Sequence, residues 1–194
     1  MGEATLYAAV GIPQGVITDP EAGQAAGAVR RGGALVSLTP EDYGLWASLG
    51  TPMSRATLEE AAAASGRMAA YDAIKRLTEQ DLVLGLDLEG SLDGQLRYLR
   101  PVPRGAGVGN LASEPGTYQI KDEYLPQSTA VAVDAVGIML WWELDGSVSL
   151  RTAMDNVGRR LPELPRISLE RLAAVLLMRL MAQHLIYLDI AREI

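Results

Sequence analysis

The sequence contains no cysteine and a single histidine, and both scarcities limit the chemistry that the chain can perform. Without cysteine there is no disulfide and no thiol nucleophile, and one imidazole cannot build a histidine-rich metal site. That histidine, His184, is expected at the end of the last helix, where a cation suits the negative helix terminus. We therefore interpret it as structural or surface-exposed. Phenylalanine is also absent, without consequence for function.

Positive charge and long apolar runs are scarce as well. The formal net charge is −7, and general affinity for nucleic-acid phosphates depends on clustered Lys and Arg, so DNA is a less favoured partner. No stretch of about 18 apolar residues is free of charges, and the N-terminus has neither a basic region nor a long apolar region. We expect no membrane span, no signal peptide and a cytoplasmic location.

Catalytic patterns are missing too. There is no HExxH, Gly-x-Ser-x-Gly, P-loop or EF-hand pattern. Gly105, Gly107 and Gly109 superficially resemble a dinucleotide-binding loop, but that loop must follow a strand and open a helix, whereas these glycines lie in a Pro-flanked segment. The carboxylates are better explained by helix caps, turns and solvent exposure. The sequence predicts a protein that is not an enzyme and has no metal and no cofactor.

What the chain does contain is an internal repeat. The stretch TAVAVDAVGIMLWWELDG (Thr129–Gly146) has a counterpart in ALVSLTPEDYGLWASLG (Ala34–Gly50). Each reads as a short alternating strand followed by an apolar helix that ends at glycine, and Val36 corresponds to Val131 at an offset of 95 residues. Repetition of one supersecondary unit predicts two copies of a small module.

The first module is expected to follow a strand or hairpin within residues 1–33. Its capping signals are Thr39 before Pro40 and a capping box at Thr57–Glu60. Its predicted elements are a strand at 34–38, helices at 40–49, 58–64 and 67–79, and a β-hairpin formed by 82–88 and 95–102 around Asp93-Gly94. A strand, three helices and a hairpin make up a winged helix.

The second module is predicted to lack a full wing. Its expected elements are strands at 117–121 and 130–133, helices at 135–144, 149–161 and 169–183, the last capped by Ser168, and a closing strand at 185–188. The fold class is therefore expected to be α+β, with tandem winged-helix modules. The predicted domains are residues 1–102 with a hairpin wing, a Pro/Gly linker at 103–116, and residues 117–194.

The second module resembles a known family. Its alternating strand, the segment VDAVGIMLWWELDGS, an amphipathic helix, and a long helix ending MAQHLIYLD look like the PqqD family, the small winged-helix domains called RiPP recognition elements. The first copy, with LVSLTPEDYGLWASLG and LTEQDLVLGLD, is similar. The resemblance implies that each module binds a peptide, namely the leader of a ribosomally synthesised and post-translationally modified peptide.

In that family the leader adds as a strand to the sheet edge, in the cleft between the third strand and the third helix. The resemblance therefore implies two sets of candidate peptide-binding residues. In the second module they are Val131, Ala132, Val133, Arg171, Val175, Met178 and Arg179. In the first module they are Val36, Ser37, Leu38, Tyr71, Lys75 and Arg76.

Two other functions stay open at this level. The predicted wing, with Arg67, Lys75 and Arg76 on the third helix, would suit a DNA-binding transcriptional regulator, although Asp72 and Glu79 lie on the same helix. A structural subunit of a larger complex is the other reading. The expected partner is a peptide or protein, such as a precursor peptide or its modifying enzyme.

The last helix and Trp142 also admit two readings each. Residues 169–183 are apolar on two stripes, so this helix is either buried between the modules or forms a groove for a peptide or a second subunit, as in a homodimer. Trp46 and Trp141 occupy the same place in the two copies and are expected in the cores. Trp142 has no counterpart and is assigned to the module interface, with an exposed binding role as the alternative.

Overall fold

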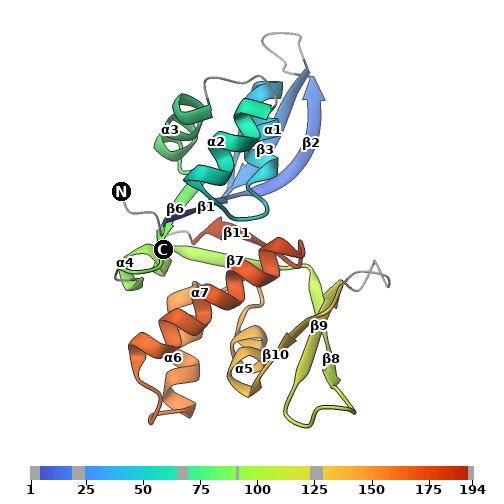
Figure 1. The fold of residues 1–194 in the computed structure, drawn as a ribbon, viewed down its shortest axis with the longest axis vertical. Coiled ribbons are helices and arrows are strands. Elements are labelled where there is room, and N and C mark those ends of the chain that lie inside the picture. Colours follow the sequence, from blue (N-terminus) through green and yellow to red (C-terminus); the bar gives the residue numbers. More distant parts are fainter. Residues whose placement is uncertain (1–4, 19–24, 65–69, 91, 123–128, 192–194) are drawn as a thin grey trace. The chain divides into compact units, whose positions relative to one another are not determined.

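The computed structural model describes residues 5–18, 25–64, 70–90, 92–122 and 129–191 of the 194-residue chain. The chain divides into two compact units, unit 1 (Met1–Glu89) and unit 2 (Gly90–Ile194). Over the described residues these contain seven helices and four small antiparallel sheets (Figure 1). The predicted α+β class is therefore confirmed.

The described residues of unit 1 form two three-stranded sheets, with strand orders β5-β1-β6 and β2-β3-β4, and three helices. Its elements in chain order are β1 (Thr5–Ala9), β2 (Ile12–Thr18), β3 (Ala25–Arg31), β4 (Ala34–Leu38), α1 (Pro40–Ser48), β5 (Met53–Ser54), α2 (Arg55–Ala64), α3 (Ala70–Glu79) and β6 (Val83–Asp87). The strand pairing places the first and last strands of the unit side by side, so that β1 pairs with β6.

Unit 2 contains a three-stranded sheet of order β10-β9-β8 and a two-stranded sheet of β11 and β7. Its elements in chain order are α4 (Asp93–Leu96), β7 (Leu99–Pro103), β8 (Gly105–Asn110), β9 (Tyr118–Asp122), β10 (Val131–Val133), α5 (Ala135–Glu143), α6 (Leu150–Arg160), α7 (Arg166–Ala182) and β11 (Ile186–Ile190). As in unit 1, an early strand pairs with the last one, and three consecutive strands form a meander before three helices.

The caps of the helices repeat between the units. In unit 1 the Ser54 hydroxyl accepts from the backbone N–H of Thr57 at 3.2 Å, and in unit 2 the Ser149 hydroxyl accepts from Thr152 at the same distance. A side-chain oxygen in this position satisfies one of the free N–H groups of a helix start. The capping box predicted at Thr57–Glu60 is therefore displaced, because α2 begins at Arg55 and is capped by Ser54.

The ends of α3 and α7 repeat as well. Asp81 (φ 52°) and His184 (φ 54°) both adopt the left-handed conformation directly after these helices. The next residue then donates back into the helix, from Leu82 to Leu77 and from Leu185 to Leu180, both at 2.8 Å. This is the closing pattern that usually uses glycine. His184 is thus part of a helix end, as expected, and α7 starts after Pro165 rather than at Ser168.

The predicted wing and linker are wrong. The strand β6 pairs with β1 rather than with 95–102, and the segment around Asp93-Gly94 forms the short helix α4 instead of a turn. The strand β7 pairs with β11. Residues 105–110, placed in the predicted linker, form β8 and pair with β9, so the three glycines there lie in a strand and open no helix. Along the sequence, unit 1 ends at Glu89 and unit 2 begins at Gly90.

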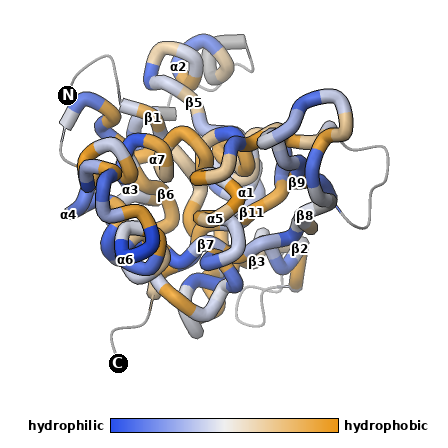
Figure 2. The backbone as a smooth tube through the Cα atoms, turned by 90° about the horizontal axis from the view of Figure 1, so that it is seen from below, coloured by the Kyte–Doolittle hydropathy of each residue, from blue (hydrophilic) through white to orange (hydrophobic). Residues whose placement is uncertain are grey.

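The remaining boundaries agree to within a few residues. The third helix of unit 1 was expected to start at Arg67; residues 65–69 lie outside the described part, and the helix is seen from Ala70. Strand β1 lies within the segment expected to form a strand or hairpin, and β2 and β3 in the same segment pair with each other inside unit 1. In α6, Leu150, Ala153, Met154 and Val157 are buried with the spacing of one helix face, and the tube of this helix is coloured both blue and orange in Figure 2.

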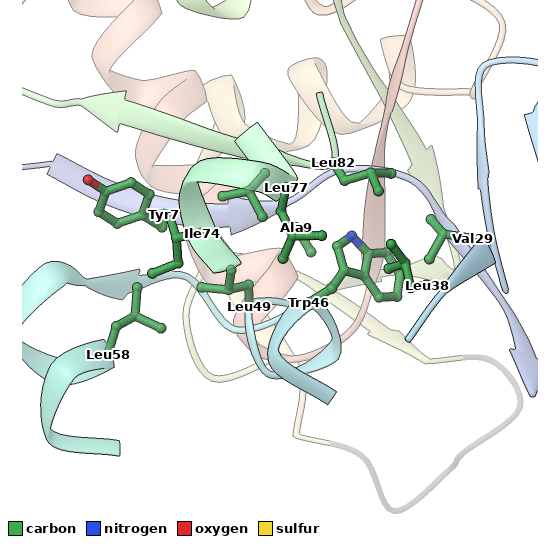
Figure 3. Close-up of a cluster of buried hydrophobic side chains, with 11 residues drawn as sticks. Tyr7, Ala9, Val29, Leu38, Trp46, Leu49, Leu58, Ile74, Leu77 and Leu82 are labelled. Carbon is green, nitrogen blue, oxygen red and sulfur yellow. The ribbon is translucent and has the colours of Figure 1, made fainter. Parts of the chain in front are cut away.

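The indole of Trp46 lies within the core of unit 1. In Figure 3 this ring lies between Ala9 and Leu38, within a cluster of buried apolar side chains. Its Nε1 donates to the Val10 carbonyl at 3.0 Å, which satisfies the one polar atom that the indole buries. The counterpart Trp141 is also buried in unit 2, at 7% exposure. The two tryptophans are therefore core residues, as predicted.

Candidate functional site

A groove in unit 2 lies between the strand β10 and the helix α7, beside the start of α5. Its volume is about 320 Å³. The residues that line it are Thr117, Ala132, Val133, Asp134, Gly137, Leu172, Val175, Leu176 and Arg179. It brings together an edge strand, an apolar helix face and two charged side chains.

The strand β10 is short and lies at the edge of its sheet, in the order β10-β9-β8. Val131 and Val133 are buried, at 4% and 5% exposure, whereas Ala132 between them is half-buried; both Ala132 and Val133 line the groove. This alternation follows from the period of two residues along a strand. An edge strand presents backbone groups that can pair with another extended chain.

The helix α7 supplies the opposite wall. Leu172, Val175, Leu176 and Arg179 recur at the spacing of one helix face and all line the groove. Leu172 and Val175 remain 37% and 54% exposed, although the helix buries another apolar face in the core of its unit. A second, exposed apolar stripe on a helix suits contact with a peptide or another protein.

The two charged side chains make different contacts. Arg179 Nη2 donates to the carbonyl oxygen of Ala132 at 2.8 Å. Asp134 caps α5, because its Oδ1 accepts from the backbone N–H of Gly137 at 2.7 Å. Within the described part of the chain, Arg179 forms no ion pair. Its guanidinium therefore has donors left for another acceptor.

Gly137 keeps the groove open at the start of α5. A Cβ added here would lie 2.9 Å from Cβ of Val133 and 3.3 Å from Asp134 Oδ1. Contacts this short require the neighbours to move, so a side chain at this position would crowd the end of β10. The absence of a side chain at Gly137 is thus part of the shape of the site.

The candidate residues of unit 2 fall into two groups. Ala132, Val133, Val175 and Arg179 line the groove. Val131 belongs to the same strand, but it is buried and does not line the groove. Arg171 is exposed and Met178 is half-buried, and both lie outside the groove lining. The stripe chosen from the sequence was therefore rotated by about one residue around the helix. The spacing 172, 175, 176 and 179 is the signal that would have found the correct face.

The candidate residues of unit 1 are not gathered into one site. Val36 is half-buried, Ser37 exposed and Leu38 buried on β4. Tyr71 lies instead with Tyr7 and Arg55, whose guanidinium carbon is 4.9 Å from the centre of the Tyr71 ring. This corrects the expectation that Tyr71 faces the third strand of the module.

The cations of α3 are paired with carboxylates. Arg76 Nη2 lies 2.9 Å from Asp42 Oδ1, and Lys75 Nζ lies 4.0 Å from Glu79 Oε1. These partners reduce the positive charge that this helix offers to a phosphate backbone. Arg67, the third cation invoked for DNA binding, lies outside the described residues.

Trp142 is 62% exposed on α5, and its ring meets Tyr118 edge-on with 6.5 Å between the ring centres. Tyr118 lies on β9 directly opposite Val133. Trp142 therefore packs loosely within its own unit, and its assignment to the module interface stays a prediction.

The described residues contain no group of three or more His, Cys, Asp or Glu side chains able to hold a metal ion. Two groups outside the groove have shifted pKa values. Hydrogen bonds from Ser147 lower the pKa of Asp145; burial lowers the pKa of Arg166, but the carboxylates of Glu170 and Asp155 outweigh it and raise this pKa. Among the described helices, none has the length and apolar character needed to cross a bilayer.

Comparisons of the chain with protein-family models, with curated proteins and with solved structures found no match.

Proposed function

We propose that this protein is a non-enzymatic peptide-binding protein, and that unit 2 takes up an extended peptide as an added strand along β10. The observation that carries the proposal is the groove of about 320 Å³ between this edge strand and the exposed apolar face of α7. In strand addition, backbone hydrogen bonds to the edge provide affinity, and neighbouring pockets select side chains. Edge and pocket lie side by side here.

The apolar wall supports the same function. Leu172 and Val175 on α7 would be covered by alternate side chains of an added strand. In unit 1 the position that matches Val175 is Asp72, as judged from the matching ends of α3 and α7. A charged side chain here does not favour an apolar ligand, so the function is assigned to unit 2.

The finer identity belongs to the same proposal. A three-stranded meander followed by three helices occurs in each unit, and the sequence of unit 2 resembles the PqqD-like RiPP recognition elements. On this basis the units are divergent copies of a winged-helix module. The partner is then the leader segment of a precursor peptide.

Fluorescence anisotropy tests the proposal, with the full chain titrated into fluorescein-labelled leader segments of precursor peptides encoded beside this gene. We expect saturable binding with a Kd below about 50 μM. Val175→Asp should weaken it about tenfold, because it places a charge on the apolar wall.

The matched control is Val16→Asp, at a valine of β2 that is 70% exposed. This variant should bind as tightly as the original chain. Absence of saturable binding would refute the leader-peptide assignment, and equal weakening by both substitutions would refute the assignment to the groove.

A further inference from the structure

An ion pair between the first and third helices of unit 1 lacks its carboxylate in unit 2. In unit 1, Asp42 is the third residue after the helix cap Thr39, and its carboxylate pairs with Arg76 of α3 at 2.9 Å. In unit 2 the third residue after the helix cap Asp134 is Gly137, which has no side chain. Gly137 lines the groove. The carboxylate of the first unit therefore has no counterpart at this position of the second.

The arginine of the pair is present in both units. Arg76 immediately precedes Leu77, and Arg179 immediately precedes Leu180, the two leucines whose carbonyls accept the closing hydrogen bonds of α3 and α7. Arg179 lines the groove and donates to the Ala132 carbonyl, as described above. Unit 2 thus keeps the cation of the pair and places it at the edge strand.

The helix starts show the same difference in charge. The first turn of α1 carries two acids, Glu41 and Asp42, whereas the first turn of α5 carries none. The acidic cap Asp134 replaces one of them, and its Oδ1 already accepts from Gly137. The first helix of unit 2 therefore begins with one carboxylate fewer than that of unit 1.

From this comparison we infer that the groove selects an extended peptide carrying an Asp or Glu, whose carboxylate takes the place that Asp42 holds in unit 1 and pairs with Arg179. The inference rests on the proposed function, since it concerns the same groove. An arginine fork and a carboxylate form the stronger class of hydrogen bond. Asp134 opposes this through repulsion, but it is held by the cap and forms no ion pair with Arg179.

Recognition of the acid is coupled to strand addition. In the structure Arg179 donates a hydrogen bond to the carbonyl oxygen of Ala132, which is a backbone acceptor of the edge strand. A peptide carboxylate that draws the guanidinium towards itself leaves this acceptor for a peptide N–H. The acidic side chain therefore assists pairing of the backbone beside it, and a neutral peptide has to displace Arg179 without that compensation.

The test uses the full chain and a display library of random twelve-residue peptides. Peptides enriched on the original chain should share an Asp or Glu at one position within an apolar pattern. For an enriched peptide, replacing this acid by its amide should weaken binding about fivefold. With the Arg179→Gln variant, the acidic peptide and its amide form should bind within about twofold of each other.

Arg76→Gln is the matched control, because it removes the corresponding arginine of unit 1 and should leave the fivefold preference unchanged. Gly137→Asp should recreate the ion pair of unit 1 and abolish the preference, and Gly137→Asn, which carries the same crowding against Val133, should retain it. Thermal unfolding of both Gly137 variants identifies loss of folding, in which case the Arg179 and Arg76 variants decide the matter.

The possible failures are distinguishable. If no peptide is enriched, the proposed function fails, and the inference fails with it. If peptides are enriched and compete for the groove but show no acid preference, or if the preference survives Arg179→Gln, only the acid-recognition inference is refuted.

Discussion

Arg100 on β7 and Asp189 on β11 lie opposite each other in the antiparallel pair, and their side chains form an ion pair. The Asp189 side chain is fully buried, whereas that of Arg100 retains 23% exposure. The corresponding pair in unit 1 is Leu6 and Leu86, which lie opposite each other on β1 and β6. The chain therefore contains an apolar version of the same strand pair.

This comparison allows the cost of breaking the ion pair to be worked out. Arg100→Leu leaves the Asp189 carboxylate buried and should lower the free energy of unfolding by about 3–5 kcal/mol. Asp189→Leu removes the counterion of Arg100. Because the Arg100 side chain is partly exposed to water, this substitution should lower the free energy of unfolding by only about 2–3 kcal/mol.

The double substitution should be far milder than either single change. It reproduces the leucine pair of unit 1, and buried ion pairs are often replaced by apolar residues without loss. Within the described residues the buried Nε of Arg100 also has no hydrogen-bond partner, a cost that the double variant removes. We expect its stability to lie within about 1 kcal/mol of the original chain, or above it.

Urea unfolding followed by tryptophan fluorescence measures these free energies, with one transition fitted per unit. Unit 2 reports through Trp141 and Trp142. The control Arg97→Leu changes an exposed arginine of the same unit and should stay within about 0.5 kcal/mol. The reasoning is refuted if the double variant loses the sum of the two single losses, because the ion pair would then contribute no coupling.

Three further substitutions test local features. His184→Gly should stabilise unit 2 by about 0.5–1 kcal/mol, because glycine adopts φ 54° without strain. Calorimetry should show this as a higher melting temperature; a lower one would contradict the closing role of this residue. Ser147→Ala should raise the pKa of Asp145 towards its ordinary value of 3.8, measured by NMR titration of the carboxyl carbon. Because folding lowers this pKa, the stabilisation is present at neutral pH and is lost as the pH falls through the folded-state pKa, so the variant should lose less stability in acid. Trp46→Phe should cost about 1–3 kcal/mol in urea unfolding, because it leaves the buried Val10 carbonyl without its donor, and an unchanged midpoint would show that water replaces the indole.

Features encoded by neighbouring residues were the ones that the sequence could predict. The start of α1 is determined by Thr39 and Pro40, and that of α6 by Ser149, so the predicted boundaries lie close to the observed ones. The repeated tryptophan of the first helix indicated a buried position correctly in both units. Each of these signals acts within a few residues along the chain.

Strand partners could not be read in the same way. Asp93-Gly94 between two apolar stretches is a typical hairpin signal, and it suggested that 82–88 pairs with 95–102. The observed partners lie far away in sequence, since β6 pairs with β1 and β7 with β11. Such pairing depends on which strands complete each core, and short-range periodicity in the sequence does not indicate the partners.

The groove was predicted in part for a similar reason. Its two walls were expected to be the third strand and the third helix, and Ala132, Val133, Val175 and Arg179 do meet there. The sequence does not distinguish the groove-facing side of the long helix, because apolar residues occur around most of it. Gly137 was missed because its contribution is an absent side chain.

The difference between the leucine pair and the ion pair also bears on exchange of strands between the two units during folding. Exchange of β1 and β7 would place Leu6 opposite Asp189 and Arg100 opposite Leu86. Each wrong pair would bury a charge without its counterion, which costs several kcal/mol. Neighbouring modules of one chain are prone to such misassembly. The difference at these four residues therefore favours pairing of each closing strand within its own unit.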